Sequence, residues 1–134
     1  MRVQFAVAAA GILLGVCSAV PLLAHHSFAA EYDSAKPITI TGSVTKVEWM
    51  NPHARFYVDV KDESGKVTNW NFELGAIPVL LKQGWKRDSL KVGDQVTVDG
   101  SRAKDGSNSA NARKVVLPDG RRVFGGSSAP DAQQ

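Results

Sequence analysis

The chain contains few of the residues on which catalytic and disulfide chemistry depends. Its 134 residues include one cysteine and three histidines, and aromatic side chains make up 7%. No serine stands in a Gly-x-Ser-x-Gly elbow, and the glycines never form a phosphate-binding loop of the required pattern. The sequence therefore offers no recognisable catalytic set, and it favours a protein that is not an enzyme.

A strong excess of one charge is also absent. The 16 Lys and Arg residues against 13 Asp and Glu residues give a formal net charge of +3. Nucleic-acid binding usually requires basic residues that cluster in a stripe or patch. We therefore expect no nucleic-acid partner.

Residues 1–24 have the pattern of a cleavable signal peptide. Arg2 supplies a basic start, the run from Phe5 to Val20 has no charged residue, and the small residue Ala24 precedes polar chain. A membrane anchor normally needs about 20 apolar residues, and this run is shorter. We expect export to the periplasm and no membrane span after cleavage.

The expected cleavage follows Ala24, so that the mature chain begins at His25. Cleavage after Ala19 is an alternative. A second alternative is lipoprotein processing at Cys17. It is disfavoured because the bulky Val16 stands where the processing signal needs a small residue. Cleavage after Ala24 removes 24 of the 134 residues and leaves 110, without a cysteine, so the exported protein has neither a disulfide nor thiol chemistry.

Residues 38–124 are predicted to form a small β domain, with an extended lead at 25–37 and a disordered tail at 125–134. The apolar residues of the first strand change parity between Val44 and Val47, which predicts a β-bulge near 45–46. The next two strands alternate cleanly, with these residues facing inward: Ala54, Phe56, Val58, Val60, Trp70, Phe72 and Leu74.

A short helix is predicted after the third strand. Pro78 suits a first helical turn, and Gly84 suits the position after the last turn. The residues expected on its inner face are Ile77, Leu80 and Leu81. Trp85 follows the helix and is expected to plug one end of the domain.

Two further strands follow, around Val96 to Val98 and at 110–117, and Asp119-Gly120 allows a tight hairpin into 121–124. Three strands, a helix and two strands is the order of an OB-fold. We predict an all-β protein with one short helix, a five-stranded OB-like Greek-key barrel of order β-β-β-α-β-β. A small open β-sandwich is the alternative.

All three histidines fall at two places, at the expected mature terminus (His25 and His26) and in the loop after the first strand (His53). The α-amine and ring Nδ1 of a terminal histidine form a chelate, and the amine gives up its proton near pH ~8. His53 or His26 would complete a three-nitrogen set. Such ligands suit copper(II) best, with zinc(II) and nickel(II) behind it. The alternative is three polar residues without a metal.

A second group of residues predicts a ligand- or partner-binding face. The loops between strands one and two, and between four and five, frame the usual binding face of an OB-fold. A solvated loop is the structural alternative for each. The expected partner is an envelope protein or a small ligand, and the candidate residues are Trp49, Asn51, Arg55, Arg102, Lys104 and Asn108.

Three motifs together resemble a family of small exported bacterial proteins that is catalogued only as a domain of unknown function. They are residues 25–33 (HHSFAAEYD), 47–54 (VEWMNPHA) and 102–108 (RAKDGSN). The resemblance covers about residues 25–123 and implies export and a small OB-type barrel. It implies no activity. The His-His start and the Asn-Pro-His segment match the family pattern, which is why the histidines are the first candidates.

Two functions therefore remain open from the sequence. The first is a periplasmic metal-binding protein, with copper as the expected metal. The second is a non-enzymatic interaction or ligand-binding module of an envelope system that uses no metal. Copper redox chemistry at the same histidines is the enzymatic alternative.

Overall fold

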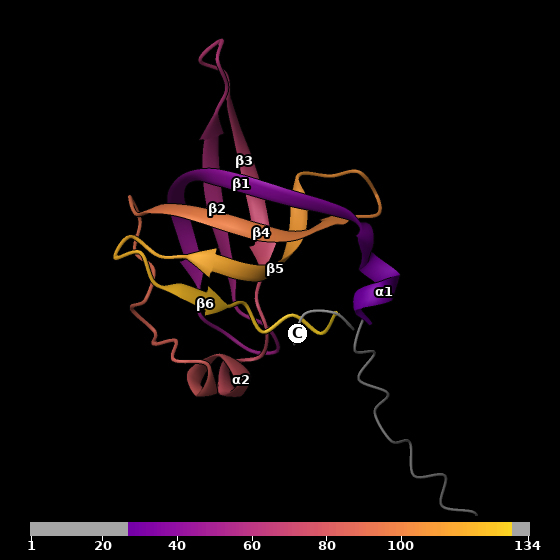
Figure 1. Ribbon diagram of the computed structural model, residues 1–134, viewed down its shortest axis with the longest axis vertical. Coiled ribbons are helices and arrows are strands. Elements are labelled where there is room, and N and C mark those ends of the chain that lie inside the picture. Colours follow the sequence, from indigo (N-terminus) through magenta and orange to yellow (C-terminus); the bar gives the residue numbers. More distant parts are fainter. Residues whose placement is uncertain (1–26, 130–134) are drawn as a thin grey trace, which may run out of the picture.

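Strands that close into a barrel dominate residues 27–129, the part of the chain that the computed structural model describes (Figure 1). The elements in chain order are α1 (Phe28–Glu31), β1 (Tyr32–Glu48), β2 (Arg55–Lys61), β3 (Val67–Glu73), α2 (Ile77–Lys82), β4 (Gln95–Ala103), β5 (Ser109–Val116) and β6 (Arg122–Phe124).

The sheet closes through a parallel contact between β3 and β5. Its hydrogen-bonded order is β3-β2-β1-β4-β5-β6, and residues 71–73 of β3 pair with 109–111 of β5. The circuit is therefore β1-β2-β3-β5-β4 and back to β1, with β6 added beside β5. The predicted all-β, OB-like barrel with a helix between the third and fourth strands is confirmed. The hairpin expected after Asp119-Gly120 is the β5–β6 pair.

The core fills the inside of this barrel, and the predicted alternation of β2 and β3 holds. The largest fully buried side chains are Phe56, Phe72, Leu74, Leu80, Val44, Val58, Val98 and Val115. The rings of Phe56 and Phe72 stack at 5.3 Å between centroids. The opposite parity of β2 and β3 points out of the barrel, and the candidate site lies on that outer face.

The β-bulge of the first strand is confirmed. Val44 pairs with Val58 and Lys46 pairs with Tyr57, so Thr45 is the extra residue. Because the bulge shifts the parity of β1 by one, the strand places apolar residues inward both before and after it. This lets one long strand pair with β4 along its first half and with β2 along its second half.

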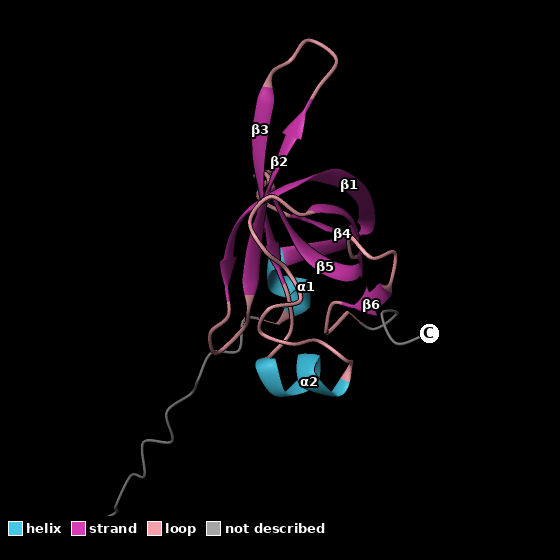
Figure 2. Cartoon of the chain, turned by 90° about the vertical axis from the view of Figure 1, so that its left-hand side faces the viewer, coloured by secondary structure: helices cyan, strands magenta, loops and turns pink. Residues whose placement is uncertain are grey.

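The helix α2 lies at one end of the barrel (Figures 1 and 2), where the sequence placed it. Its Leu80 is fully buried, but Leu81 is 54% exposed. The expectation that Leu81 faces inward is wrong, because the helix has only six residues and presents one side chain to the core. Gly84 follows with φ +89°, and buried Trp85 donates from Nε1 to the carbonyl oxygen of Phe124 at 2.7 Å.

Both flanks of the barrel differ from expectation. The predicted lead contains α1, and β1 already begins at Tyr32 rather than at 38. Residues 125–129, predicted as disordered, pack against the barrel: Gly125 donates to the carbonyl of Arg113 at 2.7 Å, and Ser127 and Ala129 are buried. The ordered packing of this segment could not be predicted from the sequence, because small residues pack through close backbone contacts that leave no hydrophobic pattern. The expected signal peptide, His25, His26 and 130–134 lie outside the described residues.

A second apolar cluster sits outside the barrel where these two flanks meet. It is formed by Phe28, Tyr32, Ala103 and Ala129, with Phe124 packed against it. Tyr32 pairs with Ala103 of β4, and its ring lies 5.8 Å from that of Phe28. Tyr32 links this cluster to the buried Glu73, whose carboxylate accepts from the tyrosine hydroxyl at 3.2 Å.

Candidate functional site

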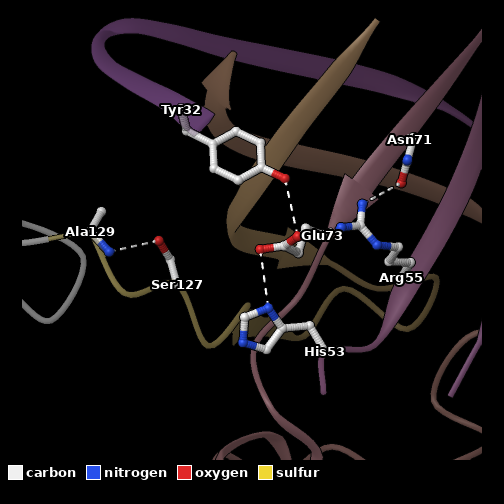
Figure 3. Close-up of polar contacts among 7 residues, drawn as sticks. All are labelled: Tyr32, His53, Arg55, Asn71, Glu73, Ser127 and Ala129. Carbon is white, nitrogen blue, oxygen red and sulfur yellow. Dashed lines mark hydrogen bonds and ion pairs between the residues drawn. The ribbon is translucent and has the colours of Figure 1, made fainter. Parts of the chain in front are cut away.

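A buried carboxylate, that of Glu73, is the centre of the polar contacts on this outer face (Figure 3). Glu73 is the last residue of β3 and is only 7% exposed. Its Oε2 accepts from the hydroxyl of Tyr32 at 3.2 Å and from Nη2 of Arg55 at 2.5 Å, and its Oε1 lies 3.2 Å from Nδ1 of His53. We call these four residues the Glu73 cluster. Three separate segments of the chain thus meet at one carboxylate.

Three members of the Glu73 cluster stand at the start or end of a strand, and the fourth, His53, lies in a loop. Arg55 opens β2 and is the register partner of Glu73, while Tyr32 opens β1. His53 lies in the loop before β2, after the cis peptide bond between Asn51 and Pro52. The segment that carries Ser127 and Ala129 runs beside the cluster (Figure 3).

Charge and burial fix the protonation of Tyr32. Burial of its hydroxyl raises the pKa of Tyr32 well above the usual range, and the negative charge of Glu73 adds to this effect. The phenol therefore stays protonated and donates to Glu73 at all ordinary pH values. The guanidinium of Arg55 compensates the carboxylate charge, as a buried charge requires.

His53 has the most exposed side chain of the Glu73 cluster. Its side chain is 36% exposed, and the ring nitrogen other than Nδ1 points away from the carboxylate (Figure 3). When Nδ1 donates to a carboxylate, the neutral ring presents its Nε2 lone pair outward. Metal-binding histidines commonly have such a carboxylate partner, which sets the tautomer and the ring orientation. His53 is thus suited to bind a metal.

The remaining predicted metal ligands, His25 and His26, lie outside the described residues. Within residues 27–129, no group of three or more His, Cys, Asp or Glu side chains is arranged to hold a metal ion. The described part of the chain therefore supplies at most part of a metal site, and His53 is its candidate ligand.

A buried side-chain oxygen that has no hydrogen-bond partner within residues 27–129 lies beside Glu73. Asn111 is paired with Glu73 across the parallel β3–β5 contact and is 4% exposed. Its Oδ1 accepts no hydrogen bond from the residues that the structure describes. A buried oxygen in this state costs free energy unless a donor reaches it.

A groove of about 590 Å³ opens next to the Glu73 cluster. It runs between α1, the start of β1 and the loop that connects β4 to β5, and Arg55 stands at its β2 side. Lys104, Asp105 and Ser107 line it from the loop, and Ser109 lines it from β5. Two of the predicted binding residues, Arg55 and Lys104, therefore face one groove.

Arg102 has a structural role in the same loop. Its guanidinium lies 5.4 Å from the ring centroid of Trp70, and its Nη2 donates to the carbonyl of Gly106 at 2.9 Å. Asn108 is exposed, and its backbone carbonyl accepts from the amide of Asn71 at 3.0 Å. These contacts fix the shape of the loop and leave Arg102 outside the residues that line the groove.

Two residues of the other predicted loop lie apart from the cluster. Trp49 is partly buried and packs against the barrel core, while Asn51 is exposed. Among the predicted site residues within 27–129, the structure brings His53 and Arg55 together at Glu73, and Arg55 and Lys104 together at the groove.

The residue that organises the site was not predicted. Glu73 follows Phe72 on the outward parity of β3, where a glutamate is ordinarily a solvated surface residue. The available signals were that Arg55 is also outward and that both residues stand at the end of a predicted strand. Joining them needs the β2–β3 register, and the burial of Glu73 needs Tyr32 and the C-terminal segment.

Comparison with known proteins places the chain in a family. The model of a family of unknown function, DUF6152, matches residues 13–112, which include the whole Glu73 cluster. No curated protein matches the chain. The helices found within residues 27–129 are too short or too polar to cross a membrane. Because the family model covers well over half of the sequence, the chain belongs to the family of unknown function DUF6152.

Proposed function

We propose that the protein is an exported, periplasmic protein that binds copper(II) through His53 and the amino-terminal His25. The observation that carries the proposal is the 3.2 Å contact between Nδ1 of His53 and the buried carboxylate of Glu73. A carboxylate that holds one ring nitrogen leaves the other available to a metal and raises its basicity. Zinc(II) and nickel(II) bind the same nitrogen ligands less tightly.

The position of Phe28 supports a shared site. The described chain begins at Ser27, and the ring of Phe28 lies 5.8 Å from that of Tyr32, which shares Glu73 with His53. His25 lies two positions before Ser27, and two extended residues span about 7 Å. The proposed site uses the α-amine and ring of His25, with His26 as a spare ligand or an orienting group.

The chemistry of the ligands determines what the protein does with copper. An amine and two imidazoles form a nitrogen-only set that favours copper(II) over the other divalent metals of the first row. The barrel supplies a rigid support for His53, and the terminus supplies the chelate. Such a site suits binding and delivery of the ion.

The test is a copper(II) titration of protein with the expected processed terminus, followed by calorimetry. The terminus is first established by intact mass. His25→Ala and His53→Ala should each weaken binding at least about tenfold, as should one extra residue before His25. Asn51→Ala is the matched control, since it alters an exposed side chain of the same loop. Unchanged affinity with the extra residue would refute the terminal chelate.

A second candidate function is a non-enzymatic ligand-binding or interaction module of an envelope system, without a metal. The groove beside the Glu73 cluster favours it, because two cations and a buried apolar floor face one concave surface. If this function alone is correct, copper(II) affinity will be the same in His53→Ala as in the unaltered protein. Lys104→Glu will then abolish the interaction, whether the partner is an envelope protein or a small molecule.

A further inference from the structure

We propose that the groove between α1 and the β4–β5 loop binds a small organic carboxylate. Its volume of about 590 Å³ lies within the 300–1,000 Å³ range of small-molecule sites. The proposal is independent of copper, because its ligand contacts are Arg55 and Lys104 rather than the histidines.

Two hydrogen bonds hold the Arg55 side chain in place in the absence of a ligand. Its Nη1 donates to Oδ1 of Asn71 at 3.4 Å and its Nη2 donates to Glu73 at 2.5 Å. A guanidinium has five N–H donors in a rigid fork, so three have no contact within the described residues. The side chain is 32% exposed and lines the groove. A fixed guanidinium with spare donors is well suited to bind carboxylate oxygens.

Lys104 provides a second cation from a distant part of the chain. Its Nζ donates to the carbonyl oxygen of Ala29 in α1 at 2.5 Å, and the residue lines the groove. An ammonium group has three donors, so two have no contact within the described residues. The hydroxyl of Ser109, on the β5 side of the groove, adds a neutral donor.

The negative charges at the groove are partly satisfied within the loop. Asp105 accepts from the backbone amide of Ser107 at 2.9 Å, and hydrogen bonds from Ser107 lower the pKa of Asp105. Glu31 stands at the end of α1 and also lines the groove. Together with the Glu73 charge beside Arg55, these groups reduce the positive potential. We therefore expect weak binding, with a Kd of about 0.1–1 mM.

The floor of the groove explains why the ligand is organic. Tyr32 and Ala103 are both buried and belong to the second apolar cluster. A short aliphatic chain can lie against them while its carboxylates face Arg55 and Lys104. An inorganic anion gains nothing from that surface, and a monocarboxylate engages one cation rather than two.

The test is an amide NMR titration of metal-free protein with succinate, acetate and inorganic phosphate. Succinate should give saturable shifts at residues 30–32, 55 and 103–109 and should bind more tightly than acetate or phosphate. Lys104→Ala should weaken succinate at least about fivefold. Lys36→Ala is the control, because Lys36 is exposed, contacts Asp33 and does not line the groove; it should leave the affinity unchanged.

Arg55→Lys tests the fork directly, since it keeps the charge and loses the planar donors. It should weaken succinate at least about fivefold. If the Arg55→Lys variant does not fold, Lys104→Ala still tests the proposal, because the Lys104 side chain is exposed. The absence of saturable shifts at 50 mM succinate, phosphate binding as tight as succinate, or equal losses in Lys36→Ala and Lys104→Ala would each overturn the proposal. His53→Ala should retain succinate binding. A failure of the copper proposal can therefore be distinguished from a failure of the carboxylate proposal.

Discussion

Arg55 and Glu73 face each other across the paired strands β2 and β3, with Nη2 and Oε2 2.5 Å apart. The pair joins the first residue of one strand to the last residue of the next, at the barrel end where β1 also begins. A carboxylate buried to this extent is tolerated only with a compensating charge and further hydrogen bonds. The pair therefore couples the stability of the barrel to the geometry of the candidate site.

Glu73→Gln should destabilise the fold by about 1–3 kcal/mol, because Arg55 and His53 lose the charged acceptor while the shape is kept. Partial exposure of Arg55 keeps the loss below that of a fully buried pair. Urea unfolding measures it. Glu63→Gln, in the exposed β2–β3 turn, is the matched control and should change stability by less than about 0.5 kcal/mol. Equal midpoints for the two variants would show that the Glu73 charge is not structural.

Tyr32 should titrate only when the fold is lost at high pH. Its pKa is raised by burial and by the charge of Glu73, so the stability that its protonated form contributes is present at neutral pH. That stability declines once the pH rises above the unfolded value of about 10. Ultraviolet absorbance of a Tyr57→Phe variant isolates this group, because the chain has two tyrosines. A normal phenol titration in the folded state would contradict the burial.

Gly126→Ala should detach the C-terminal segment and destabilise the protein by about 2–3 kcal/mol. Gly126 has φ +73°, and an added Cβ would lie 2.9 Å from Cα of Gly75. Gly120→Ala is the matched control, since Gly120 has φ +82° with nothing within 4 Å of the new atom. It should show the backbone cost alone, about 1 kcal/mol. Thermal unfolding compares the two, and an equal loss would mean that the Gly75–Gly126 contact contributes nothing.

Leu80→Ala should cost about 2–5 kcal/mol, because the side chain is fully buried in the barrel core. The neighbouring Leu81→Ala should cost less than about 1 kcal/mol, since Leu81 is largely exposed. Chemical denaturation of the two variants tests how α2 is oriented. Similar losses would restore the original expectation that both leucines face inward.

The parts of the fold that follow from local periodicity could be predicted. The parity change between Val44 and Val47 located the bulge, and alternation in β2 and β3 identified their inner faces, because side chains in a strand alternate with a period of two. The order of strands and helix then restricted the topology to a few choices. In α2 the same reasoning failed for Leu81, because two helical turns give too few residues to define a face.

The Glu73 cluster could not be predicted in this way. Its geometry depends on the register between β2 and β3, on where β1 begins, and on the burial supplied by residues 125–129. None of these leaves a periodic signal in the sequence. Small residues such as Gly125 and Ser127 resemble a disordered tail in composition, and their order becomes visible only in their burial and in backbone contacts such as the one to Gly75.

The packing of Ala129 against Phe28 and Tyr32 has a consequence for the order of folding. A chain that emerges from its amino end presents Phe28 before β1 and Ala129 only after β6. The outer apolar cluster therefore cannot be completed until β6 and the segment after it have emerged. A protein truncated before Gly125 would have the strands of the barrel but would lack Ala129, which would leave Phe28 and Tyr32 more exposed to water.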